Sequence, residues 1–408
     1  MQLSRRKFLG LIGLGAAGVV GTRGFQGLTL LVGAQETKFP TPPIIGERLD
    51  NHRMVFSLVA DEGQVNVAGR SARLFTYNGS YPGPTLRMRE GDDVQVHFTN
   101  NLSDPTNLHF HGLHISPTGR GDNIFRRVQP GETATYEFTV PGDSAGTYWY
   151  HPHVHGTVAP QLFRGLAGTI VVEGAFDAAF SDLREQLLVL KDFEFRANGV
   201  VENHGMMDWA MGREGSLLTV NGEETPSLDV PEGAVRLRLL NAANARYYRL
   251  AVPEATLTVI ATDGGFVSEP YPVNDLLLAP GERFEVVAQF PRSGRFELTA
   301  LPYNRAPEEM PLMDGMSAMP GHNMGSTENN EGVMNMTTGV SAATPIMRFE
   351  VGASSSYRPP SRLAPITALT PETAVARRRI VLSEDMMAAE FYIDDKRFDA
   401  ARTDFAPA

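Results

Sequence analysis

Residues Asn78–Leu86 read Asn-Gly-Ser-Tyr-Pro-Gly-Pro-Thr-Leu, and Asn221–Leu228 repeat the pattern as Asn-Gly-Glu-Glu-Thr-Pro-Ser-Leu. Asparagine, glycine and proline in this order favour a tight turn that leads into a strand. Each copy continues through a glycine into a run of alternating apolar and polar residues that ends in asparagine, at Asn100 and at Asn241. The shared order of these landmarks indicates that the chain contains an internal repeat.

Two further landmarks follow in the same order in both copies. Pro-Gly-Glu occurs at Pro130–Glu132 and again at Pro280–Glu282. The segment Gly146–Tyr150 is matched in the same way by Gly294–Leu298. Four landmarks in one order point to two homologous modules rather than to a chance match.

Each repeat is predicted to form a β-sandwich, and we place the two modules at residues 36–175 and 176–305. Alternation with a period of two is clear at Asp93–Phe98 and at Val235–Leu239, as expected of strands with one face on a core. Prolines and glycines cluster between such runs, which is typical of antiparallel folds. The predicted fold class is therefore all-β, with tandem Greek-key sandwiches.

A third copy is predicted to begin near the C-terminus. Phe391–Asp399 resemble the start of the other modules, so residues 391–408 are interpreted as the truncated beginning of a third one. One unpaired strand cannot form an independent domain. A C-terminal extension that packs on the second module is the alternative. Residues 346–390 are predicted to be a connector.

Composition excludes several classes of site. The chain has 408 residues, a formal net charge of −11 and no cysteine. Without cysteine there are no disulfides, zinc–thiolate sites, iron–sulfur clusters or thiol nucleophiles, and a blue-copper centre is excluded because it needs a cysteine sulfur. The acidic balance and the lack of a basic patch argue against a nucleic-acid partner.

The N-terminus is predicted to be an export signal. The pair Arg5-Arg6 is followed by an apolar run from Phe8 to Val20. This pattern is typical of a signal for the twin-arginine export machinery, to which we assign residues 1–34. The apolar run is too short to cross a hydrocarbon core of about 30 Å. We expect a periplasmic protein with no membrane span after removal of the signal.

Six of the ten histidines lie in two short segments, His109–His114 and His151–His155. Each segment starts with His-x-His, and side chains two residues apart on a strand point to the same face. Two such strands side by side would bring four imidazoles together, those of His109, His111, His151 and His153. Imidazole is a good ligand for copper and zinc, so these four histidines are predicted to bind metal.

The repeat provides an internal control for this prediction. Counted from the shared landmarks, the matching positions of the second module carry no histidine; they are Leu250, Val252, Thr299 and Leu301. The same fold is therefore built without these histidines, which favours a metal-binding role over a structural one.

On these motifs the chain resembles the multicopper oxidases, the family of laccases and copper-efflux oxidases built from cupredoxin modules. The resemblance rests on Asn78–Leu86, on His-x-His-Gly at residues 109–112 and on Gly146–His153. It implies a copper-dependent oxidoreductase that couples one-electron oxidation of a small reducing substrate, Cu(I) or a phenol, to reduction of dioxygen to water. In the family, substrate is oxidised at a blue copper in the third module, and electrons pass to a trinuclear cluster between modules one and three.

The resemblance also implies roles for individual residues. By position, His109 would bind the type 2 copper, and His111, His151 and His153 would bind the type 3 pair. Asp122 resembles the acidic residue beside the family's cluster, a catalytic group that helps deliver protons to reduced oxygen. An ordinary Gly-Asp-Asn turn residue is the alternative for Asp122.

The sequence departs from the family pattern in its missing ligands. The other four cluster histidines and the type 1 copper ligands come from the family's third module, and none is present. The chain would thus hold half of a trinuclear site and no electron entry. It is then a truncated or fragment sequence, a member that has lost catalysis, or a chain whose partner supplies the third module. A non-catalytic copper-binding or structural envelope protein is the alternative function, although structural members typically lose the cluster histidines.

Methionine is concentrated in residues 306–345, which are predicted to form a flexible segment. Four methionines recur there at intervals of three, namely Met310, Met313, Met316 and Met319. Nearby prolines and glycines argue against a helical core stripe. Thioether sulfur prefers Cu(I), and the resemblance implies that such segments collect Cu(I) for copper tolerance. A low-complexity linker is the alternative.

Overall fold

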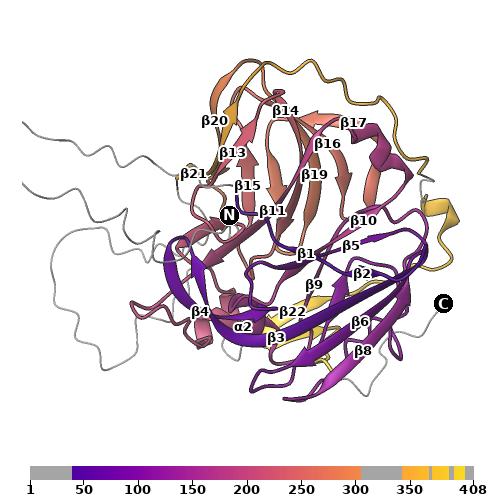
Figure 1. Ribbon diagram of the computed structural model, residues 1–408. Helices are drawn as coiled ribbons and strands as arrows, with labels where there is room; N and C mark the ends of the chain where they lie inside the picture. The colour runs from indigo at the N-terminus through magenta and orange to yellow at the C-terminus, as the bar shows by residue number, and fades with distance from the viewer. Residues whose placement is uncertain (1–38, 305–341, 367–369, 386–389, 400–408) are drawn as a thin grey trace, which may run out of the picture. The chain divides into compact units, whose positions relative to one another are not determined.

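The computed structural model describes residues 39–304, 342–366, 370–385 and 390–399 (Figure 1). Strands dominate these residues, and the α-helices are single short turns such as α2 (Val158–Phe163) and α3 (Met206–Met211). The predicted signal and the four methionines lie outside the described residues. Among the described residues, no helix has the length and apolar character needed to span a membrane.

The first module is a sandwich of two sheets (Figure 1). One sheet has the strand order β1 (Ile44–Ile45), β5 (Gly83–Arg89), β10 (Gly168–Glu173), β9 (Gly146–His151) and β7 (His109–His111). The other has the order β2 (Glu47–Arg48), β3 (Arg53–Val67), β6 (Asp93–Asn100) and β8 (Thr133–Thr139), and β4 (Arg70–Tyr77) pairs with β3. In β6 the apolar positions are buried and the polar ones mostly exposed, as the alternation predicts. Phe56, Phe98 and Phe110 are among the buried side chains between the sheets.

The second module repeats this arrangement. Its first sheet has the order β12 (Leu217–Val220), β11 (Arg184–Phe193), β14 (Ala234–Asn241), β19 (Arg283–Gln289), β16 (Thr256–Thr262) and β17 (Gly265–Val273). Its second has the order β13 (Ser227–Val230), β21 (Thr344–Val351), β20 (Gly294–Leu301), β15 (Tyr248–Ala251) and β18 (Leu276–Leu278). The all-β fold class with tandem sandwiches is therefore confirmed.

The same turn occurs three times in the described chain. Asn78, Asn221 and Asp394 have φ values of 53°, 52° and 50°. Their Oδ1 atoms accept hydrogen bonds from the backbone N–H groups of Val59, Val189 and Val381, at 2.7, 2.7 and 2.8 Å. The third turn follows the hairpin of β22 (Leu382–Asp385) and β23 (Glu390–Ile393). Residues around Asp394 thus have the local geometry with which the other two modules begin.

The strand-ending asparagines also match in their contacts. Asn100 donates from Nδ2 to two backbone carbonyls, and its Oδ1 accepts from the N–H two residues on. Asn241 makes the same three bonds in the second module. The two modules therefore share the hydrogen bonds of this asparagine as well as the order of their strands.

The second module extends beyond the bounds expected from the sequence. Strand β21, at Thr344–Val351, pairs with β13 and β20, although residues from 346 on were expected to be a connector. It takes the place that β10 has in the first module. The spacing of the repeat does not predict this strand, because residues 302–343 separate β21 from β20 in the chain. Phe39, which was assigned to the first module, is buried in the core of the second.

Charged residues join the two modules at one side of their boundary. Arg236 and Arg238 alternate with core residues on β14, yet all eight residues of the strand are buried. Glu285 on β19 accepts hydrogen bonds from Arg236 at 3.0 and 2.6 Å, from Arg238, and from Thr147 Oγ1 of the first module at 2.7 Å. The alternation therefore marks a face that meets the other module rather than solvent.

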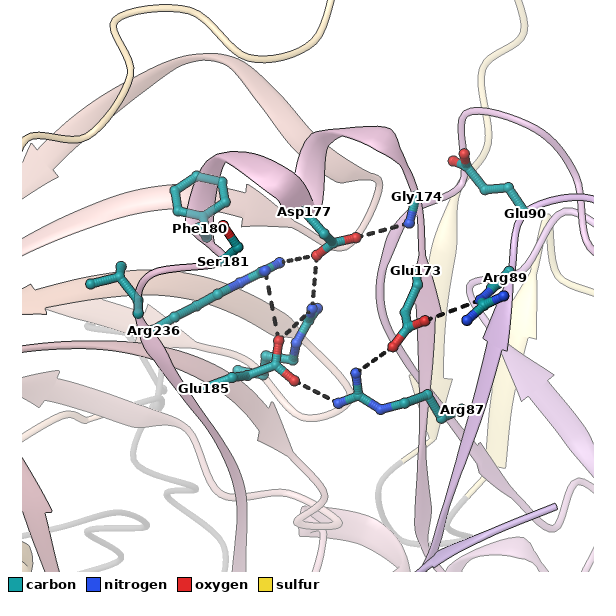
Figure 2. A pocket seen from close by; sticks show the side chains of 12 residues that line it. Arg87, Arg89, Glu90, Glu173, Gly174, Asp177, Phe180, Ser181, Glu185 and Arg236 are labelled. Atoms are coloured by element: carbon teal, nitrogen blue, oxygen red, sulfur yellow. Dashed lines mark hydrogen bonds and ion pairs between the residues drawn. The ribbon is translucent and has the colours of Figure 1, made fainter.

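This ion network continues into a cavity of about 690 Å³ (Figure 2). Asp177 lies 2.7 Å from Arg236, and Glu185 lies 2.8 Å from Arg238. Arg87 of the first module bridges Glu173 and Glu185 at 2.7 and 2.6 Å. Positive and negative side chains are therefore paired around this cavity, and some of the pairs join the first module to the second.

Candidate metal centre

The pairing of β7 with β9 brings the two histidine segments together. His109 lies opposite His151, and His111 lies opposite Trp149. The side chains of His109 and His111 point to the same face because they are two residues apart on β7, as the sequence predicts. Buried Phe110, between them, points into the core of the sandwich. The β-pairing thus separates a core face from a face that carries imidazoles.

Four imidazole rings are neighbours on that face. Nitrogen atoms of His109, His111 and His151 lie within 4.8 Å of one another. The ring of His153 is centred 5.0 Å from that of His109 and 6.1 Å from that of His151. Nδ1 of His111 is 3.2 Å from Nε2 of His151. The structure therefore brings all four predicted histidines together.

His153 is positioned differently from the sequence expectation. Strand β9 ends at His151, so the second His-x-His does not lie on one strand. The backbone N–H of His153 instead donates to Oδ1 of Asn107 at 2.6 Å. Nδ2 of Asn107 donates to the carbonyls of Ile124 and Arg126, both at 2.9 Å. Asn107 thus ties His153 to the loop that carries Asp122, a role that the sequence analysis missed.

Asp122 contacts His109 directly. Its carboxylate oxygens lie 2.8 and 3.0 Å from Nδ1 of His109, and Oδ1 also accepts from the backbone N–H of Phe110 at 2.9 Å. With its Nδ1 proton donated to Asp122, the His109 ring keeps the lone pair of Nε2 free for a metal ion. Nδ1 of His151 is held in a similar way by the carbonyl of Pro152 at 2.8 Å.

Burial lowers the pKa of three of the imidazoles. Burial, together with the positive charge of Arg283, lowers the pKa of His111 to about 3. Burial also lowers the pKa of His151 well below its usual value and lowers that of His153, and the neighbouring His109 adds to both effects. Neutral imidazole is the form that coordinates a metal ion. These three rings are thus available as ligands at neutral pH.

Trp149 is a further site residue whose role the sequence did not reveal. Its ring stacks on His111 at 4.9 Å and lies 4.1 Å from the ring of His151. It faces the histidines because it stands opposite His111 in the β7–β9 pair. A cavity of about 480 Å³ opens beside the cluster, lined by His109, His111, His114, Tyr148 and Arg283 among others.

The strand register corrects one detail of the internal control. In the second module Thr299 lies opposite Ala251, as His151 lies opposite His109, so the structural counterpart of His109 is Ala251 and not Leu250. The loop before β15 is one residue longer, and a one-residue shift moves a side chain to the other face. The second module still has no histidine at any of these positions.

The remaining candidates are the four methionines and two further histidines. Met310, Met313, Met316 and Met319 lie outside the described residues, so the structure does not place them. His114 and His155 are exposed, and His155 stacks on Phe398 at 4.5 Å.

Two sequence models of one protein family match the chain. Both are described as multicopper oxidase, and they match residues 59–176 and 189–312. The cell division protein FtsP of Yersinia pestis is 34% identical over 307 residues, which cover 74% of this chain and 62% of that protein. FtsP of Photorhabdus laumondii is 30% identical over 407 residues, or 97% of this chain and 76% of that protein. The chain spans about three fifths of the length of the first of these relatives.

A solved structure agrees with these matches. The multicopper oxidase from Campylobacter jejuni, described as a metallo-oxidase, superposes with a TM-score of 0.73 at 28% identity. The superposition covers 90% of this chain and 75% of that one.

Proposed function

Because the chain belongs to the multicopper oxidase family, we propose that it is a copper-binding oxidoreductase whose first module holds half of a trinuclear copper cluster. The observation that carries this proposal is the convergence of His109, His111, His151 and His153 on one face. In a protein with the remaining ligands, the reaction couples one-electron oxidation of a reducing substrate to reduction of dioxygen to water.

The donor set fits copper. It consists of buried or half-buried imidazoles, and imidazole nitrogen is a preferred ligand of copper. Two of the rings have Nδ1 engaged by a protein oxygen, from Asp122 or Pro152, which leaves Nε2 as the coordinating atom. Bound copper would supply the redox chemistry, taking electrons from the substrate and passing them to dioxygen. By the family resemblance, His109 belongs to the type 2 copper and the other three to the type 3 pair.

Asp122 is the proposed proton carrier of the site. Its carboxylate is close to the cluster through Nδ1 of His109 and largely buried. A carboxylate in this place can hold a proton and pass it on through water to oxygen that is being reduced. It also fixes the tautomer of His109, so one residue serves orientation and proton transfer.

The complete activity needs parts that this chain does not carry. It has no cysteine, so the type 1 copper that accepts electrons in the family cannot form from these residues. We propose that residues 391–408 begin a third module. The rest of the complete site would then come from the same protein or from a partner chain. The turn at Asp394, which repeats those at Asn78 and Asn221, supports this proposal.

The proposed location is the periplasm, reached by the twin-arginine machinery. The support is the Arg5-Arg6 pair with its following apolar run. The proposed reducing substrate is Cu(I), with phenols as the other class. The support for Cu(I) is the series Met310, Met313, Met316 and Met319, whose soft sulfurs suit cuprous ions.

A second candidate is a non-catalytic role in the cell envelope. The support is the similarity to proteins named for cell division. The retained histidine cluster favours copper binding over a purely structural role. Oxygen consumption by the protein isolated at its native length, with Cu(I) or a phenol, separates the two candidates. Absence of copper-dependent consumption there would favour the envelope role.

Copper titration of the chain itself tests the proposed site. The double variant His109→Ala, His153→Ala should lose tight copper binding, whereas His52→Ala, His97→Ala is a control because both side chains are exposed and neither residue lies on β7 or β9. Unchanged stoichiometry in the first variant would move the copper site to the methionine segment.

A further inference from the structure

The second module touches the histidine cluster through a turn that both modules share. Gly131 and Gly281 stand at the same place in the repeat, with φ values of 80° and 84°. Each donates its N–H to the carbonyl of the strand-ending asparagine, at 2.7 Å to Asn100 and 2.8 Å to Asn241. The backbone of the two turns is therefore equivalent.

The surroundings of the two glycines differ. A Cβ atom on Gly131 would meet no atom within 4 Å. A Cβ atom on Gly281 would lie 3.2 Å from Cε1 of His111 and 3.5 Å from Cζ2 of Trp149. A side chain at residue 281 would therefore be strained by the positive φ and would press on the His111 ring.

Arg283 fixes this turn against the first module. It is buried, whereas Thr133 at the matching place is exposed. Its guanidinium donates to the carbonyls of Thr147 at 3.1 Å and Asp263 at 2.9 Å, and it pairs with the Asp263 carboxylate at 2.7 Å. A Cβ atom on Gly112, next to His111, would collide with Nη2 of Arg283. The side chain therefore lies directly on the backbone of the histidine motif.

Strand β7 needs such support because it is short and lies at a sheet edge. It has three residues, and among the described strands it pairs only with β9. The His111 ring stacks on Trp149 at 4.9 Å, and on another side it lies so close to the Gly281 turn that a Cβ atom there would stand 3.2 Å from its Cε1. Two neighbours of the ring, one from each module, limit its rotation.

We propose that the Gly281–Arg283 turn is the positioning element of the His111 imidazole, so that ligand geometry in the first module depends on docking of the second. The consequence for copper rests on the proposed function, but the positioning itself does not require metal. Residues that orient a ligand from outside the coordination sphere typically change metal affinity by about 10–100-fold when they are replaced.

The test compares Gly281→Ala with Gly131→Ala. Both variants place alanine at a positive φ, so both should lose a similar stability of about 1–2 kcal/mol. Only Gly281→Ala introduces a methyl group beside His111. In metal-free protein labelled at histidine, the Cε1–H resonance of His111 should shift in Gly281→Ala and stay in place in Gly131→Ala, because the ring moves relative to Trp149.

The copper arm uses the same pair. Gly281→Ala should weaken Cu(II) binding by about 10–100-fold and change the EPR hyperfine splitting, with Gly131→Ala close to the parent chain. If Gly281→Ala does not fold, Arg283→Lys replaces it, since lysine keeps the charge and loses the forked hydrogen bonds. Equal His111 shifts in the test and control variants would overturn the positioning proposal. Absence of copper binding in the parent chain would instead overturn the proposed function, with the resonance result still valid.

Discussion

Replacing Glu285 by glutamine would test whether the buried ion network holds the modules together. Glu285 is 1% exposed and is shared by Arg236, Arg238 and Thr147. Loss of one partner from a buried ion pair costs about 3–5 kcal/mol, because a charge remains without compensation. Asp177 and Glu185 still contact the two arginines, so we expect the low end of this range, about 3 kcal/mol.

Urea unfolding followed by tryptophan fluorescence measures this loss, and Trp149 lies on β9, two residues after the boundary residue Thr147. The matched control is Glu254→Gln, since Glu254 is 61% exposed and pairs with Arg292, itself 53% exposed. An exposed pair contributes at most about 1 kcal/mol. If the two variants differ by less than 1 kcal/mol in the free energy of unfolding, the network does not stabilise the joint.

Two predictions concern acid and the histidine ring. Burial raises the pKa of Glu185, but Arg238, Arg236 and Arg87 lower it more, to about 2. The contribution of ionised Glu185 to the free energy of unfolding is therefore complete above pH 4.5 and is lost as the pH falls toward 2. Glu185→Gln should therefore flatten the fall in stability over that interval, seen in unfolding series at stepped pH; an unchanged slope would contradict the assigned partners. The His111 ring, with a pKa lowered to about 3, should not titrate between pH 5 and 8 in histidine NMR spectra, whereas a midpoint near 6.5 would place the ring in solvent.

The repeat carried most of what the sequence could predict about the fold. Asn78 and Asn221 could be recognised in the sequence because the side chain of each accepts a hydrogen bond that forms the turn. The turn therefore has asparagine at the same position in both modules. The strand β21 was missed for the opposite reason. It returns to the sheet after a long insertion, and the partners that define it, β13 and β20, are far away in the chain.

The sequence predicted the four histidines of the candidate site and, through the family resemblance, Asp122, but not the position of His153 or the other residues that hold the rings. His-x-His has a period that places two rings on one face, so the residues of β7 could be read directly. His153, Asn107 and Trp149 depend on a loop hydrogen bond and on cross-strand pairing, which spacing alone does not encode. The alternation of Val235–Leu239 could not distinguish a face toward solvent from a face toward another module, because both favour polar residues.

Duplication offers a way to understand the arginines at the joint. Counted from the shared asparagine and Pro-Gly-Glu landmarks, Arg236 and Arg238 replace Gln95 and His97, and Arg283 and Glu285 replace Thr133 and Thr135. One module carries the histidine cluster, and the other carries the arginines and the glutamate at the boundary with it. In this division, a substitution at Gly281 or Arg283, outside the module that carries the histidines, is expected to change the surroundings of His111.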